Sequence, residues 1–166
     1  MLIKTPFDTP APLTGEASID IRADQKDIFA FVADRFFENY TRWAPEVVEF
    51  EPIDGDVVRQ GARARQLRVE RGCPEESILC VTTYRPNEEF VVEGEEAPFS
   101  QCYMVERSDE DQALSTLTFR FELRQLELFM RPFQKLIRIA IEEGAEKTVE
   151  NIGRLLNESP TLQTRG

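Results

Sequence analysis

The residues that most often carry catalysis are scarce in this chain, and their scarcity limits its chemistry. There is no histidine, so a dyad or triad that uses imidazole as its base is impossible. No G-x-S-x-G, G-x-G-x-x-G or Walker A pattern occurs. Acidic pairs fall at predicted turns and strand ends: Glu75-Glu76, Glu88-Glu89 and Glu95-Glu96. Because general acid–base catalysis needs a pocket that tunes the pKa, we interpret these pairs as solvated surface and predict no catalytic residue.

The cysteines do not suggest a metal site. Cys73, Cys80 and Cys102 are odd in number and lack C-x-x-C spacing. Without imidazole partners they predict reduced thiols, and we expect neither a metal nor another cofactor. Residues 1–6 contain no apolar core of a secretory signal. We therefore expect a cytoplasmic protein.

The charge of the chain restricts its partners. The formal net charge is −11, so nucleic acid and anionic lipid headgroups are disfavoured unless the positive charge is segregated. Arginines are concentrated in one region: Arg59, Arg63, Arg65, Arg68 and Arg71. They are typical of a strand whose arginines pair with glutamates on neighbouring strands. The alternative is an arginine that meets a ligand carboxylate at the mouth of a pocket.

Length and composition predict one globular domain. The chain has 166 residues, of which 41% are hydrophobic, and no uncharged stretch approaches the ~18 residues of a membrane helix. Prolines at 6, 10 and 12 and a polar C-terminus predict extended tails over residues 1–15 and 158–166. The folded domain is expected over residues 16–157.

Hydrophobic periodicity predicts an α+β fold. A strand is expected at 16–23, then short helices at about 25–35 and 36–43. The period then changes to two, which predicts strands at 48–52, 62–71, 77–84, around 90–92, at 99–107 and around 117–123. Short turns between these strands predict an antiparallel meander of about six or seven strands.

The last element is expected to be a long helix from about residue 128 to 157. Apolar residues recur at three- and four-residue spacing throughout this range. Pro132 is tolerable only in a first turn or at a kink. Gly144 lies among the apolar positions, where glycine costs about 1 kcal/mol relative to alanine. We interpret it as a point of close strand packing, with clearance for a ligand as the alternative.

The order and spacing of several segments resemble a known family. They are Ile19-Asp20-Ile21, the helix Asp27–Val32, Trp43-Ala44-Pro45 before a strand, Gln60-Gly61-Ala62-Arg63, and the long terminal helix. Over residues 16–157 the chain is similar to the START-like (SRPBCC) superfamily, and within it to the polyketide cyclase/dehydrase and lipid-transport group. The resemblance implies a helix-grip fold, in which a curved antiparallel sheet wraps around the long helix and leaves a cavity. Members of the superfamily hold sterols, lipids, polyketides, quinones or plant hormones there, and others bind proteins.

The candidate ligand-binding residues come from the predicted inward faces of strands and helix. They are Trp43, Arg65, Tyr84, Phe90, Tyr103, Phe119, Phe121, Phe133, Ile137 and Ile141. Aromatic rings without a polar atom predominate, and a few polar groups could orient a ligand. We therefore expect a carrier for an apolar small molecule. The alternatives are a cyclase, aromatase or dehydratase, and a protein-interaction module with a filled core. Whether the chain is a monomer or a homodimer stays open.

Overall fold

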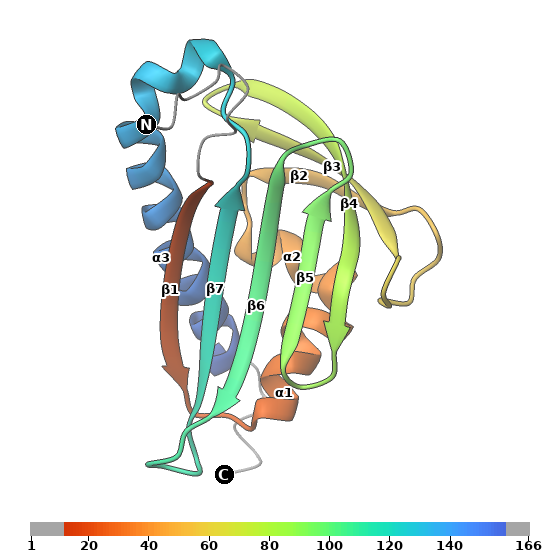
Figure 1. The fold of residues 1–166 in the computed structure, drawn as a ribbon. Coiled ribbons are helices and arrows are strands. Elements are labelled where there is room, and N and C mark those ends of the chain that lie inside the picture. The colour runs from red at the N-terminus through yellow and green to blue at the C-terminus, as the bar shows by residue number, and fades with distance from the viewer. Residues whose placement is uncertain (1–11, 159–166) are drawn as a thin grey trace, which may run out of the picture.

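The computed structural model describes residues 12–158, which form one curved antiparallel sheet and the helices that cover its inner face (Figure 1). The strand order is β1-β7-β6-β5-β4-β3-β2, so the first two strands lie at opposite edges. The strands are β1 Leu13–Ile21, β2 Val47–Pro52, β3 Arg63–Glu70, β4 Cys73–Arg85, β5 Glu89–Gly94, β6 Phe99–Arg107 and β7 Ser115–Leu123. This is the helix-grip arrangement that the family resemblance implies.

The helices form two groups. α1 (Gln25–Phe29), the π-helical η1 (Ala30–Asp34) and α2 (Phe36–Trp43) connect the two edge strands. The 3-10 helix η2 (Leu128–Phe133) leads into α3 (Gln134–Glu158). At about 1.5 Å per residue α3 is about 37 Å long, enough to run the length of the sheet (Figure 1). None of the helices within residues 12–158 is long and apolar enough to cross a bilayer.

The long helix rests mainly on the β1 edge of the sheet. A Cβ atom on Gly15 would lie 2.6 Å from the carbonyl oxygen of Ile141, so only glycine permits this close approach. Further along, a Cβ on Gly153 would lie 3.0 Å from Cδ1 of Ile19. The helix therefore packs tightly on β1, and the middle of the sheet's inner face remains open to other contacts.

The core is built from aromatic rings around α2. Phe36 is completely buried, and its ring lies 4.6 Å from that of Tyr40, 5.2 Å from Phe90 and 6.1 Å from Trp43, between centroids. Edge-to-face and offset pairs of this kind stabilise beyond their buried area. This cluster holds α2 against the sheet and so fixes the position of Tyr40 and Trp43.

The outer face of the sheet is covered by ion pairs. Arg65 contacts Glu49 at 2.9 Å and Arg120 contacts Glu16 at 2.7 Å, both across neighbouring strands. Arg63 pairs with Asp54 at 3.0 Å. For Arg65 the predicted pairing with glutamates on neighbouring strands is thus confirmed, and Arg63 pairs with a loop carboxylate; exposed pairs contribute little stability individually.

Several elements begin or end elsewhere than the pattern predicts. β1 begins at Leu13, before residue 16, because its first residues pair with the end of β7. β4 extends beyond 77–84 at both ends and forms a tight hairpin with β3 through Arg71 and Gly72, both at positive φ. Pro132 lies within η2, before the α-helix starts. This placement agrees with its tolerance in a first turn.

Candidate functional site

A cavity of about 580 Å³ lies between α2, the first half of α3 and the inner face of the sheet. Its volume falls in the range typical of small-molecule sites. The walls come from α2 (Tyr40 and Trp43), β3 (Gln66 and Arg68), β6 (Gln101 and Tyr103), β7 (Phe119, Phe121 and Leu123) and α3 (Ile137, Ile141 and Gly144). A space of this size remains between these side chains.

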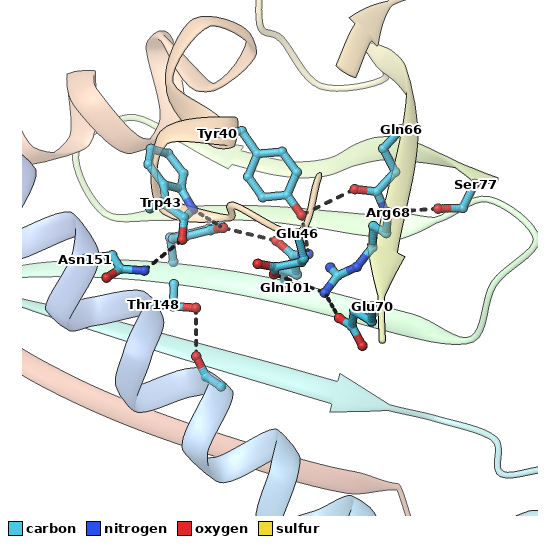
Figure 2. A network of polar contacts seen from close by, with 12 residues as sticks. Tyr40, Trp43, Glu46, Gln66, Arg68, Glu70, Ser77, Gln101, Thr148 and Asn151 are labelled. Carbon is cyan, nitrogen blue, oxygen red and sulfur yellow. Dashed lines mark hydrogen bonds and ion pairs between the residues drawn. The ribbon is translucent and has the colours of Figure 1, made fainter. Parts of the chain in front are cut away.

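One end of the cavity carries an ordered chain of neutral hydrogen bonds (Figure 2). It runs from donor to acceptor through six side chains: Trp43 Nε1 to Tyr103 Oη (3.3 Å), Tyr103 to Gln101 Oε1 (3.0 Å), Gln101 Nε2 to Tyr40 Oη (3.0 Å), Tyr40 to Gln66 Oε1 (3.4 Å), and Gln66 Nε2 to Ser77 Oγ (2.9 Å). Buried chains of this kind hold their members in fixed orientations.

Both tyrosines of this chain are held in the neutral form. Burial raises the pKa of Tyr103 well above its ordinary value, and burial also raises the pKa of Tyr40. Each residue is almost fully enclosed, so a phenolate there would lose its hydration. At neutral pH the two hydroxyls therefore act as hydrogen-bond donors and acceptors, not as nucleophiles or bases.

The raised pKa of Tyr103 predicts a pH dependence of stability. Above pH 10 an unfolded tyrosine releases its proton, whereas Tyr103 in the folded state keeps it. The contribution of Tyr103 to the free energy of unfolding is therefore complete below about pH 10 and is lost as the pH rises above it. We expect the wild type to lose more stability than Tyr103→Phe between about pH 10 and 11, by up to about 1.4 kcal/mol. Urea unfolding at pH 7, 10 and 11 measures the difference. Parallel pH profiles for the two proteins would contradict it.

Charged groups gather beside the neutral chain. Nη2 of Arg68 contacts Oε1 of Glu46 at 3.1 Å and Oε1 of Glu70 at 2.6 Å (Figure 2). Glu75 is the register partner of Arg68 on β4 and also lines the cavity, so three carboxylates and one guanidinium lie at this end. This end of the cavity therefore carries net negative charge. Among the described residues no group of three side chains is arranged to hold a metal ion.

Most of the other residues that line the cavity are apolar. They include Leu126, Met130, Ile137 and Phe121. A Cβ atom on Gly144 would meet nothing within 4 Å, and this residue also lines the cavity. The expectation of close strand packing at Gly144 is thus wrong, because α3 touches the sheet along β1 and not at this position.

The structure brings together six of the ten candidate residues. Trp43, Tyr103, Phe119, Phe121, Ile137 and Ile141 all line the cavity. That they bind a ligand remains a prediction. α2 places Trp43, the inner faces of β6 and β7 place Tyr103, Phe119 and Phe121, and the helical spacing of α3 places the two isoleucines.

The other four candidates lie outside the cavity. Arg65 is on the outer face of β3 among Glu49, Glu51 and Glu76. Phe90 is completely buried in the aromatic core. The hydroxyl of Tyr84 donates a hydrogen bond to Asp34, and burial together with this carboxylate raises the pKa of Tyr84 to about 12. Phe133 is half exposed at the end of η2.

Sequence reasoning missed the polar end of the cavity. Tyr40 on α2 and the strand residues Gln66, Arg68 and Gln101 were not among the candidates; the three strand residues were missed because inner strand positions were expected to be apolar. In β3 the apolar Leu67 and Val69 share the outer face with Arg65, so the pattern indicated the wrong side. The signal in the sequence was the pair of small apolar residues Ala62 and Ala64, which alternate with the arginines; both are buried and mark the inner face.

Comparison with known proteins agrees with this architecture. The family described as polyketide cyclase/dehydrase and lipid transport matches residues 12–156. None of the curated proteins matches the chain.

Similar solved structures include TTHA0849 from Thermus thermophilus (14% identity, TM-score 0.69, covering 88% of this chain and 99% of that one). The polyketide-cyclase-like Cgl2372 from Corynebacterium glutamicum has 23% identity and TM-score 0.60, with coverages of 89% and 93%. Truncated norcoclaurine synthase from Thalictrum flavum has 14% identity and TM-score 0.64, with coverages of 92% and 99%. At these identities the likeness concerns the fold.

Proposed function

Because this chain belongs to the polyketide cyclase/dehydrase and lipid transport family, we propose that it binds and carries an apolar small molecule in the cavity under α3. The observation that carries this proposal is the division of the cavity into a long apolar part and one polar end. Such a site buries the body of a ligand and orients it through a few polar groups. The ligand's polar group would lie against Tyr103, Gln101 and Arg68.

The charges at the polar end favour a ligand whose polar group is uncharged, such as a hydroxyl or a carbonyl. Arg68 is already paired with Glu46 and Glu70, and a ligand carboxylate would meet Glu75 as well. Like charges in a partly dry site repel strongly. This differs from the alternative that an arginine receives a ligand carboxylate.

Two fluorescent probes that differ by one charge test this preference. N-phenyl-1-naphthylamine is neutral, and 8-anilino-1-naphthalenesulfonate is a similar ring system with a sulfonate. We expect the neutral probe to bind at least about tenfold more tightly, equivalent to about 1.4 kcal/mol. Fluorescence titration of both probes into the wild type gives the two dissociation constants. Tighter binding of the sulfonate would contradict the proposed ligand class.

Native mass spectrometry tests the carrier function itself. Protein purified without delipidation and sprayed under native conditions should carry an additional mass that extraction with organic solvent removes. The matched sample is the same protein after extraction and refolding, which should show the mass of the chain alone. If the purified protein carries no additional mass, and takes up no neutral apolar probe after extraction, the proposal that it is a carrier is wrong.

An enzyme of the cyclase or dehydratase type is a second candidate, because several polar groups converge at one end of the cavity. Tyr103 and Tyr40 carry neutral hydroxyls, and Arg68 is a cation that lines the cavity with them. Donors held in this way can polarise a carbonyl oxygen. Turnover of a poly-β-ketone substrate that is lost in Tyr103→Phe would support catalysis. Tyr84→Phe is the matched control, since this tyrosine lies outside the cavity.

A further inference from the structure

The segment from Leu128 to Ile141 exposes an unusual combination of apolar and basic side chains. Of the eight large hydrophobic residues exposed on the described part of the chain, five lie here: Leu128, Phe129, Phe133, Leu136 and Ile139. Leu128, Phe129 and Leu136 are 74%, 69% and 65% exposed. Clustered apolar exposure of this kind marks an interaction surface.

All the charged residues of this segment are basic. Arg131, Lys135 and Arg138 are exposed, and none forms an ion pair with another described residue. No acidic residue occurs between Glu127 and Glu142. In a chain of net charge −11 this is a local reversal of sign. We call the eight side chains, five apolar and three basic, the η2 patch.

The position of the η2 patch connects it with the cavity. η2 and the first turns of α3 lie at the end of the molecule away from α1 (Figure 1). Met130 and Ile137 belong to the same segment and line the cavity from the other side of these helices. One short stretch of chain therefore separates the cavity from the surface that carries the η2 patch.

We propose that the η2 patch docks peripherally on the surface of an anionic phospholipid bilayer. Apolar side chains of such a helix enter the boundary between headgroups and acyl chains, while Lys and Arg contact anionic headgroups. A second copy of the chain fits the patch less well. Symmetric self-association would bring six unpaired cations together, because the same surface meets itself in a twofold dimer. Nucleic acid would leave the five apolar side chains without a partner.

Vesicle flotation tests the docking. Wild-type protein should float with vesicles of phosphatidylcholine and phosphatidylglycerol, remain unbound with phosphatidylcholine alone, and be released by high salt. Arg131→Gln/Lys135→Gln/Arg138→Gln should bind about a hundredfold more weakly, since each basic residue near an anionic surface contributes about 1 kcal/mol and 1.4 kcal/mol is tenfold. The control Arg22→Gln/Lys26→Gln/Arg59→Gln removes the same charge elsewhere and should bind like the wild type.

The apolar half of the patch has its own pair of variants. Phe133→Ser/Leu136→Ser should lose flotation, whereas Val48→Ser/Val57→Ser, which changes exposed apolar residues outside the patch, should keep it. All four variants alter exposed residues, and circular dichroism confirms that each is folded. Absence of wild-type flotation with anionic vesicles overturns the proposal. Equal loss of flotation in the control variants also overturns it. The same holds if sedimentation velocity shows that the wild type is a dimer and that Phe133→Ser/Leu136→Ser is a monomer. Uptake of a neutral probe in vesicle-free buffer is measured separately, so failure of docking is distinguishable from failure of the carrier function.

Discussion

Gly144→Phe is expected to weaken binding of N-phenyl-1-naphthylamine by about ten- to hundredfold while the protein remains folded. Gly144 lines the cavity, and a side chain attached there would meet no neighbour within 4 Å. The phenyl ring would occupy space that the ligand needs, and overfilling a site that already holds a ligand costs about 1–3 kcal/mol. Phenylalanine also has a higher helix propensity than glycine, so α3 should not be destabilised.

Gly144→Ala is the matched control for this effect. Its single methyl group takes little of the cavity, so probe affinity should stay close to that of the wild type. Its stability should rise by up to about 1 kcal/mol, because alanine replaces glycine within a helix. Fluorescence titration and urea unfolding of the three proteins provide both quantities. Unchanged probe affinity in Gly144→Phe would show that the probe binds elsewhere.

Phe36→Ala is expected to lower the free energy of unfolding by about 3–5 kcal/mol, the range for removal of a buried aromatic side chain. Phe36 is completely buried, and its ring contacts Tyr40, Trp43 and Phe90. Its loss would leave a void between α2 and the sheet and release the two α2 residues that line the cavity. Probe binding should therefore decrease together with stability.

The neighbouring Phe37→Ala removes the same side chain at a half-buried position. Among the described residues, the aromatic rings that lie against it are those of Phe36 and Phe50. A loss of about 1–2 kcal/mol is expected there, because less apolar area is removed from the interior. Urea unfolding monitored by far-ultraviolet circular dichroism measures both variants. Equal losses would contradict the central place of Phe36 in the core.

The sequence predicted the sheet well where one face is uniformly apolar. In β7, Leu117, Phe119 and Phe121 alternate with polar residues, and all three point inward. The alternation fixes the register because a slip of one residue would expose the apolar set. The same reasoning placed Tyr103 and the α3 residues Ile137 and Ile141 on the cavity.

The prediction failed where a wall is polar or a helix is uncovered. In β3, Gln66 and Arg68 face inward and line the cavity, so the inner face of this strand is polar. The apolar residues lie on the outer face with Arg65, and the pattern therefore indicated the wrong face. Phe133 belongs to the apolar spacing of the terminal helix, yet half of it is exposed. Periodicity reports which residues share a face, and it does not report whether another element packs on that face.

Energy transfer from the single tryptophan to a neutral probe tests the central claim most directly. Trp43 lies in the cavity wall and is the only tryptophan of the chain. Excitation of the indole in the presence of N-phenyl-1-naphthylamine should produce probe emission that saturates at one probe per chain and is strongly reduced in Gly144→Phe. Probe emission that rises without saturation, or is the same in both proteins, would contradict a ligand cavity beneath α3.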